Sequence, residues 1–285
     1  MKLTKTRLVE ALRKLADGKT AYQARKVAGV SVRRVYQLKE ALDKTGEIPD
    51  IGKLAGRPRK PFEEWEIQTV KKTFEKYRVS ADTLERLIDR DFKKHIGHNR
   101  IRQVLVYLGY AKKRNKNNIR KKKWKRYERR HSLTATHIDW HYFKGTWIFG
   151  VEDDASRKLL ALIEDKREST DNSIIGMEFA LKHGRIKQCI SDHGSTFTSN
   201  FIDAKSRFKD YLKLKGIKQI LCKVKHPQSN RKIEKWFECY DRNRHAFNTK
   251  EKFMYWYNDL RPHRSLKFEI LETPSQAFER KRRKE

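Results

Sequence analysis

The stretch HPQSNRKIEKW, His226 to Trp236, decides how the rest of this sequence is interpreted. It begins with residues typical of a loop and continues as a predicted helix, in which the acid Glu234 lies among basic residues. A carboxylate in such a cationic helix suggests a metal ligand for chemistry on DNA. This interpretation requires that the rest of the chain supply further acidic ligands.

The composition favours a nucleic acid as the partner. Lys and Arg number 69 against 36 Asp and Glu, which gives the 285-residue chain a formal net charge of +33. Such a field attracts polyanions, so an anionic membrane surface or an acidic protein is the weaker alternative. No run of about 18 apolar residues is present to span a membrane, and the N-terminus lacks the apolar centre of a signal peptide. Three separated cysteines without a CxxC pair indicate a reducing cytosol rather than a disulfide framework or a thiolate zinc site.

Residues 1–50 are predicted to form a helix-turn-helix DNA-binding domain. The segment AGVS is typical of the tight turn between two short helices, with Ser31 as the N-cap of the second helix. Val35, Leu38 and Leu42 recur at helical spacing and would bury that helix. Its open face carries the residues expected to contact DNA, which are Arg33, Arg34 and Gln37. A small helical bundle with a solvated basic face is the alternative.

Residues 62–111 are predicted to form a second helix-turn-helix domain. Ile101, Val104 and Leu105 would form the apolar face of its last helix, which Gly109 would end. The basic residues that point away from this apolar face are also expected to contact DNA, namely Arg100 and Arg102.

Two linkers are predicted on either side of this second helical region. Residues 51–61 contain Gly and Pro at positions that exclude a helix or a central strand. Arg57 and Arg59 in this linker are expected to enter a DNA minor groove, with a plain tether as the alternative. Residues 112–131 include KKRNKNNIRKKKWKRYERR, which holds twelve basic residues and one acidic residue and is predicted to be a basic linker.

Residues 132–250 are predicted to form a mixed α/β domain. TATHIDWHYF alternates, so that His137, Asp139 and His141 would share one face of a strand. Two further strands complete an antiparallel meander, and the pattern then continues as helix, strand, helix, strand and helix. The strand IKQCISD ends in Asp192, and the last helix is the one in the opening stretch.

This order of elements resembles the ribonuclease-H-like fold of retroviral integrases and DDE transposases. HIDW resembles the first aspartate motif, SDHGSTFTS the second, and HPQSNRKIEKW the glutamate motif. YNDLRPHRSL with ETPSQAF is similar to the segment that follows the core in transposases of bacterial and archaeal insertion sequences. The resemblance covers about residues 132–278. It implies a ribonuclease-H-like mixed sheet flanked by helices, preceded by all-α helix-turn-helix domains and followed by a helical, basic tail at 251–285.

The resemblance further implies that Asp139, Asp192 and Glu234 are the catalytic residues and the metal ligands. Two Mg²⁺ or Mn²⁺ ions, roughly 4 Å apart, would act on the attacking and leaving oxygens of phosphodiester cleavage. Nearby basic residues would hold the DNA backbone, and these are Arg231, Lys232, Lys235 and Arg242. Taken singly, the three acids have structural alternatives: a polar strand residue, a turn cap and a surface ion pair. The acidic run Glu152–Asp154 is interpreted as a structural turn.

Two positions depart from the family pattern. Arg231 stands where the third motif usually has Gly, and Asp241 replaces the base usually found two helical turns after the glutamate. Neither departure removes an implied metal ligand. Arg231 would tighten the hold of the loop on a phosphate, and Arg242 would take the place of the missing base.

As a whole, the resemblance implies a transposase that binds the terminal inverted repeats of a mobile element as a homodimer or higher oligomer. It would catalyse metal-dependent cleavage of double-stranded DNA and strand transfer into target DNA. We expect it in the prokaryotic cytoplasm, associated with the nucleoid and not with a membrane. A catalytically inactive regulatory protein and a ribonuclease-H-like nuclease without strand transfer are the alternatives.

Overall fold

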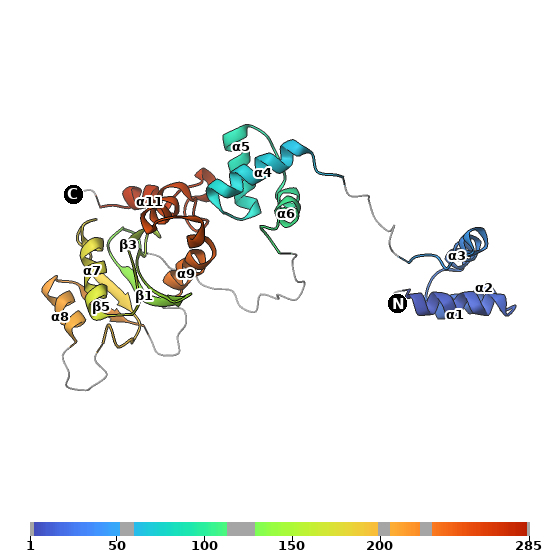
Figure 1. Cartoon of the computed structure of the whole chain (residues 1–285), viewed down its shortest axis with the longest axis horizontal. Helices are drawn as coiled ribbons and strands as arrows, with labels where there is room; N and C mark the ends of the chain where they lie inside the picture. The colour runs from blue at the N-terminus through green and yellow to red at the C-terminus, as the bar shows by residue number, and fades with distance from the viewer. Residues whose placement is uncertain (1–2, 52–59, 113–128, 199–205, 223–229, 284–285) are drawn as a thin grey trace. The chain divides into compact units, whose positions relative to one another are not determined.

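The computed structural model of the chain divides into two compact units, Met1–Pro61 and Phe62–Glu285 (Figure 1). The residues that the structure describes are 3–51, 60–112, 129–198, 206–222 and 230–283. Arg57 and Arg59 therefore lie outside the described residues, as do most of the predicted basic linker and the loop that precedes Asn230. Among the described residues, no helix has the length and apolar character needed to cross a membrane.

The smaller unit contains three helices, α1 (Lys5–Ala16), α2 (Ala21–Ala28) and α3 (Val32–Thr45). Gly29 ends α2 in the left-handed region, with φ 69°. The Ser31 hydroxyl then accepts the backbone N–H of Arg34 at 3.2 Å and caps α3. The tight turn and the N-cap predicted from the sequence are confirmed, and the role of this unit in DNA binding stays a prediction.

The larger unit begins with three more helices, α4 (Glu64–Tyr77), α5 (Ala81–Phe92) and α6 (His98–Tyr107). Ile101, Val104 and Leu105 are buried in their common core, as the apolar pattern predicts. Leu271, near the C-terminus, is buried in the same core. The second helical region and the segment after the catalytic region therefore pack together.

A five-stranded mixed sheet forms the centre of the larger unit. Its strands are β1 (Thr136–Phe143), β2 (Thr146–Asp153), β3 (Leu159–Asp165), β4 (Gln188–Ser191) and β5 (Lys218–Leu221). Their spatial order is β3-β2-β1-β4-β5, with β1, β2 and β3 antiparallel and β4 and β5 parallel to β1. The predicted ribonuclease-H-like order of elements is confirmed.

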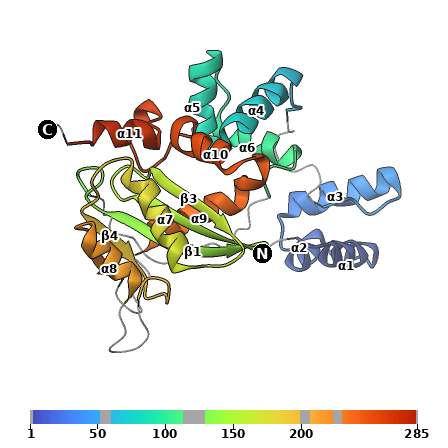
Figure 2. The same ribbon diagram turned by 60° about the vertical axis from the view of Figure 1, so that its left-hand side comes forward.

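Helices cover both faces of this sheet (Figure 2). The further α-helices are α7 (Thr170–Leu181), α8 (Arg207–Leu214), α9 (Arg231–Asn243), α10 (Lys250–Tyr255) and α11 (Pro274–Arg280). Trp140 and Phe149 pack with residues of α7 and α8 on one face, whereas Ile148 and Leu162 pack with Trp236 of α9 on the other. Short 3-10 helices lie at Arg244–Ala246 (η1) and Phe268–Ile270 (η3), and a π-helix (η2) at Trp256–Leu260.

Two glycines allow helices to approach the sheet closely. A Cβ at Gly150 on β2 would lie 2.8 Å from Trp236 Cζ3 of α9, which is shorter than any relaxed carbon contact. On the opposite face, a Cβ at Gly176 of α7 would lie 2.5 Å from Phe149 Cε1. The absence of a side chain at these two positions therefore allows α9 and α7 to pack at a short distance from the sheet.

A side chain from the C-terminal segment forms hydrogen bonds with the backbone of one residue at the outer edge of the sheet. β3 is an edge strand. The backbone N–H of Leu159 donates to Asn258 Oδ1 at 2.9 Å, and Asn258 Nδ2 donates to the carbonyl of Leu159 at 2.9 Å. The amide of Asn258, in η2, therefore takes the place of a neighbouring strand at this residue.

Candidate active site

The pairing of β1 with β4 brings two of the predicted acids to adjacent positions. His137 is the register partner of Ile190 in this parallel pair. Two residues further along, the same register places Asp139 beside Asp192, and neighbouring strands lie about 4.8 Å apart. The backbone N–H of Gly194 donates to Asp192 Oδ1 at 2.8 Å and fixes that carboxylate. The two aspartates therefore meet just beyond the end of β4.

Helix α9 brings the third acid to the same place. Asn230 immediately precedes α9, and its Nδ2 donates to Asp139 Oδ2 at 2.9 Å. Glu234 lies in the first turn of the helix and is exposed. Burial, the charge of Asp192 and the charge of Glu234 together raise the pKa of the Asp139 carboxyl to about 7. All three acids thus share one electrostatic environment.

Cys222, which follows β5, lies in the field of the same three acids. Burial and the charges of Asp192, Asp139 and Glu234 raise the pKa of its thiol to about 11. Three carboxylates that repel one another in this way are stabilised by a cation, and their hard oxygen atoms are the donors that Mg²⁺ prefers. The residues therefore fit a divalent ion by charge and by donor type. Within the described ranges, no three His, Cys, Asp or Glu side chains are already arranged as a metal site. Of the three acids, Glu234 is the one whose side chain is exposed.

The next acid on α9 has different partners. Glu238 accepts a hydrogen bond from Lys235, and its Oε2 accepts one from Arg242 Nη2 at 3.0 Å. Asp241 faces β1, where His141 Nε2 lies 3.0 Å from its Oδ1. Asp241 is therefore paired with a histidine on the strand that carries Asp139.

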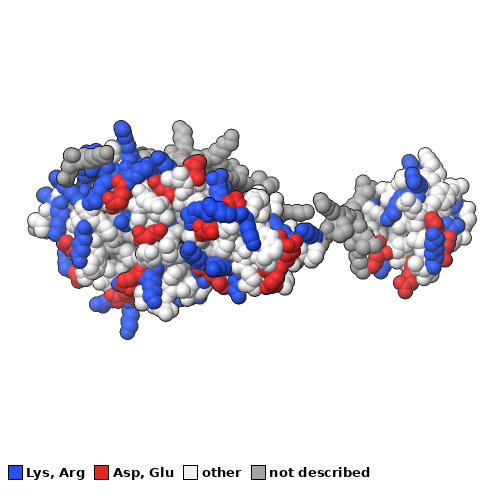
Figure 3. All heavy atoms as spheres, turned by 90° about the horizontal axis from the view of Figure 1, so that it is seen from above, with Lys and Arg blue, Asp and Glu red and all other residues white. Residues whose placement is uncertain are grey.

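The predicted DNA contacts of the smaller unit lie together on α3. Arg33, Arg34 and Gln37 are all exposed, and Arg34 Nη1 donates to Gln37 Oε1 at 3.1 Å. In the view of Figure 3, Lys and Arg side chains are scattered over the surface, with Asp and Glu side chains among them. The exposed side chains of Arg33, Arg34 and Gln37 are therefore accessible to a partner.

Several predicted DNA contacts of the larger unit are engaged within the chain. Arg100 Nη2 lies 2.6 Å from Glu66 Oε2. Arg102 Nη2 donates to the carbonyl of Lys112 at 3.2 Å. Lys232 Nζ lies 2.6 Å from a carboxylate oxygen of Asp154. Arg231, the first residue of α9, is partly exposed.

The acidic run at the end of β2 is buried. Glu152, Asp153 and Asp154 are 1%, 0% and 0% exposed. Asp153 accepts the backbone N–H of Leu133 at 2.8 Å and that of Ser156 at 2.9 Å, which holds the turn after β2. These bonds agree with the interpretation of the run as a structural turn. The sequence interpretation did not single out Asn230 as part of the site, although it stands one turn before the glutamate in the third motif.

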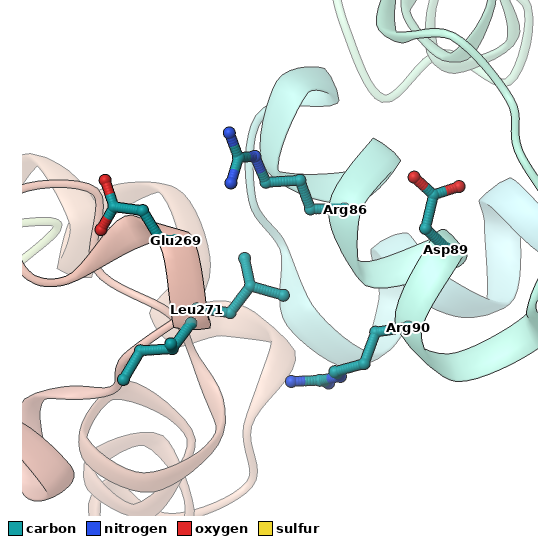
Figure 4. Close-up of a pocket in the computed structure, with 6 residues that line it drawn as sticks. Arg86, Asp89, Arg90, Glu269 and Leu271 are labelled. Carbon is teal, nitrogen blue, oxygen red and sulfur yellow. The ribbon is translucent and has the colours of Figure 1, made fainter.

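A separate pocket of about 280 Å³ lies between α5 and η3 (Figure 4). Its lining residues are Arg86, Asp89, Arg90, Glu269, Ile270 and Leu271. None of the three acids takes part in it, so it does not belong to the candidate active site.

No family model matches the chain. It is similar to the protein described as "Putative integrase ORF3" of Spiroplasma virus SpV1-C74, with 28% identity over 186 residues that cover 54% of this chain and 51% of that protein. The chain thus spans about half the length of this curated relative.

Three solved structures of viral integrases are similar in fold. The catalytic core domain of BIV integrase is 15% identical with a TM-score of 0.42, over 52% of this chain and 95% of that chain. The catalytic core domain of HTLV-2 integrase in complex with magnesium is 14% identical with a TM-score of 0.41, over 52% and 97%. A chain of the simian T-cell lymphotropic virus intasome in complex with PP2A regulatory subunit B56 gamma is 15% identical with a TM-score of 0.44, over 75% and 74%.

Proposed function

We propose that this chain is a DNA transposase of the insertion-sequence type, which cleaves DNA and transfers the cut strand at a site formed by Asp139, Asp192 and Glu234. The observation that carries the proposal is the convergence of these acids from β1, from the end of β4 and from the first turn of α9. Similarity to a viral integrase points to the same class of DNA rearrangement.

In this proposal, Asp139, Asp192 and Glu234 would hold two Mg²⁺ or Mn²⁺ ions, and the ions would supply Lewis-acid activation of the phosphodiester when bound. The bond from Asn230 Nδ2 to Asp139 Oδ2 and the bond from Gly194 N–H to Asp192 Oδ1 keep the two aspartates in place. Arg231, the partly exposed first residue of α9, would contact the DNA backbone.

The helical regions would supply recognition of the DNA. Arg33, Arg34 and Gln37 lie exposed on α3, where they are free to contact the terminal repeats of a mobile element. The proposed reaction at two element ends would be carried out by a homodimer or higher oligomer on DNA. In the regulatory alternative the chain binds DNA without cutting it, and in the nuclease alternative it cuts without joining.

Glu234→Gln and Glu238→Gln form a matched pair that tests the proposal. The full chain would be incubated with labelled DNA from the ends of its element, target DNA and Mg²⁺. We expect Glu234→Gln to reduce cleavage and joining to background while end binding and the unfolding temperature change little. Glu238→Gln should retain most activity because Glu238 is paired with Lys235 and Arg242.

The outcomes separate the alternatives. If Glu238→Gln is inactive and Glu234→Gln cuts normally, the third ligand has been assigned one helical turn too early. If both variants cut as well as the wild type, the acids are not the reactive site. Binding without cleavage would favour a regulator, and cleavage without joined products would favour a nuclease.

A further inference from the structure

The carboxylate of Asp139 is held on both of its oxygens. Oδ1 accepts the backbone N–H of Trp140 at 2.8 Å, and Oδ2 accepts Asn230 Nδ2 at 2.9 Å. The first bond is local to β1. The second joins the strand to the residue before α9, so it couples the direction of the carboxylate to the position of that helix.

The other end of the Asn230 amide lies against a buried histidine. Asn230 is 8% exposed, and its Oδ1 lies 3.3 Å from Nδ1 of His137, which is 2% exposed. An amide has a donor end and an acceptor end, and rotation by half a turn would exchange them. The Asp139 carboxylate only accepts hydrogen bonds, so the Asn230 amide turns its Nδ2 towards Asp139 and its Oδ1 towards the His137 ring.

The histidine in turn is fixed by Asp154. His137 Nε2 lies 2.7 Å from Asp154 Oδ1, which also lies 2.6 Å from Lys232 Nζ. Asp154 Oδ2 accepts the backbone N–H of Arg129 at 2.6 Å. Burial alone would raise the pKa of this fully buried carboxyl, but the hydrogen bond from His137 and the charge of Lys232 outweigh it and lower the pKa of Asp154. The ionised carboxylate of Asp154 therefore holds the His137 ring in place.

We infer that Asp154 and His137 are positioning residues that act through Asn230 on the Asp139 carboxylate, and so determine how tightly the site binds a divalent cation. The inference rests on the proposed function, because it concerns the same acids. Side chains that hold metal ligands in place commonly change metal affinity about 10- to 100-fold when they are replaced.

A partly buried ion pair at the other end of α9 provides the matched control. Glu164 on β3 lies 2.7 Å from Arg244 Nε, just after α9, and also accepts the hydroxyl of Tyr240 at 2.6 Å. This pair ties the far end of α9 to the sheet, as the Asp154 network ties its near end. It has no bond to Asn230 or Asp139 among the described residues. Loss of Glu164 should therefore destabilise the fold without affecting the acids.

The test is a calorimetric titration of the full chain with Mn²⁺, without DNA, together with thermal unfolding of each variant. We expect Asp139→Asn to remove Mn²⁺ binding and Asp154→Asn to weaken it about tenfold or more. His137→Gln keeps an amide that can still bond to one of the two neighbours, so its loss should be smaller. Glu164→Gln should lower the unfolding temperature and leave the Mn²⁺ affinity within about twofold of the wild type.

The results distinguish this inference from the proposed function. Suppose that Asp139→Asn abolishes Mn²⁺ binding, but that folded Asp154→Asn and folded His137→Gln both bind Mn²⁺ as tightly as the wild type. That result would overturn the positioning role and leave the proposed function intact. Equal weakening by Glu164→Gln would also overturn it, because general destabilisation would then account for the effect. No Asp139-dependent Mn²⁺ binding by the wild type would overturn both. If Asp154→Asn does not fold, the Mn²⁺ affinity of His137→Gln alone tests the inference.

Discussion

Replacing Gly150 by alanine would test whether the distance between α9 and the sheet controls the candidate active site. Gly150 is the register partner of Asp139 on the neighbouring strand β2. A Cβ there would lie 2.8 Å from Trp236 Cζ3 and 3.2 Å from Trp236 Cε3. Trp236 is 1% exposed, so its ring cannot turn into solvent to make room. The helix that carries it must move instead.

The size of the movement follows from ordinary contact distances. Relaxed carbon–carbon contacts lie at about 3.5–4.0 Å, so α9 must shift by roughly 0.7–1.2 Å. Overpacking of this kind destabilises a protein by about 1–3 kcal/mol. Glu234 precedes Trp236 by two residues and moves with it. Because misplacement of a reacting group by about 1 Å can lower a rate about 10²-fold, we expect a large loss of cleavage in protein that is still folded.

The assay is single-turnover cleavage of end DNA at a temperature well below unfolding, with the unfolding temperature measured in parallel. Gly176→Ala is the matched control, because its Cβ would lie 2.5 Å from Phe149 Cε1 on the opposite face of the sheet. It should destabilise at least as much and cleave nearly normally. Gly97→Ala, whose nearest neighbour would be Glu85 Oε1 at 4.0 Å, gives the baseline. Equal cleavage by folded Gly150→Ala and Gly176→Ala would refute the reasoning.

Two further predictions concern charge. Burial raises the pKa of Glu152 to about 7, so the folded state favours its neutral form, and the stability that this form contributes is lost as the pH rises from the unfolded pKa to about 7. The free energy of unfolding of Glu152→Gln, relative to that of the wild type, should therefore increase between pH 5 and pH 8, by up to about 3 kcal/mol. A difference in unfolding temperature between the two proteins that does not change with pH would argue against this. Arg33→Ala should weaken DNA binding and reduce the slope of log affinity against log salt by about 1, as expected for one lost phosphate contact. Lys44→Ala, on the same helix but paired with Glu40 at 2.7 Å, should leave that slope unchanged, and equal effects of the two variants would contradict a specific role for Arg33.

The features that could be predicted from the sequence are those that depend on neighbouring residues. Ser31 caps α3 because its hydroxyl reaches an N–H three residues ahead, and such a cap is visible in the local sequence. The alternation around Asp139 likewise predicts which side chains share its face. His141 on that face does meet α9, through Asp241. The fold class follows from the order of such local elements.

The partners of buried charges could not be predicted in the same way. Lys232 stands beside the glutamate motif in a basic stretch, which favours a contact with DNA, yet the structure pairs it with Asp154, 78 residues earlier in the chain. Asn230 and Asp139 are 91 residues apart. Such pairs depend on how strands and helices pack, and no spacing in the sequence encodes them. For the same reason, the acidic run at the end of β2 could be interpreted as part of a turn, whereas the contacts that link Asp154 to Asp139 could not be predicted.

The amide of Asn258 has a consequence for any shortened form of this protein. An edge strand with unpaired backbone groups is a template on which another chain can add a strand, and proteins protect such edges to avoid aggregation. Asn258 occupies both backbone groups of Leu159 on β3. A fragment that stops at residue 250, where the predicted catalytic core ends, would lose this protection together with the buried side chains of Phe253 and Trp256. The segment after the core therefore protects Leu159 at the β3 edge, and we expect a fragment without it to aggregate more readily than the full chain.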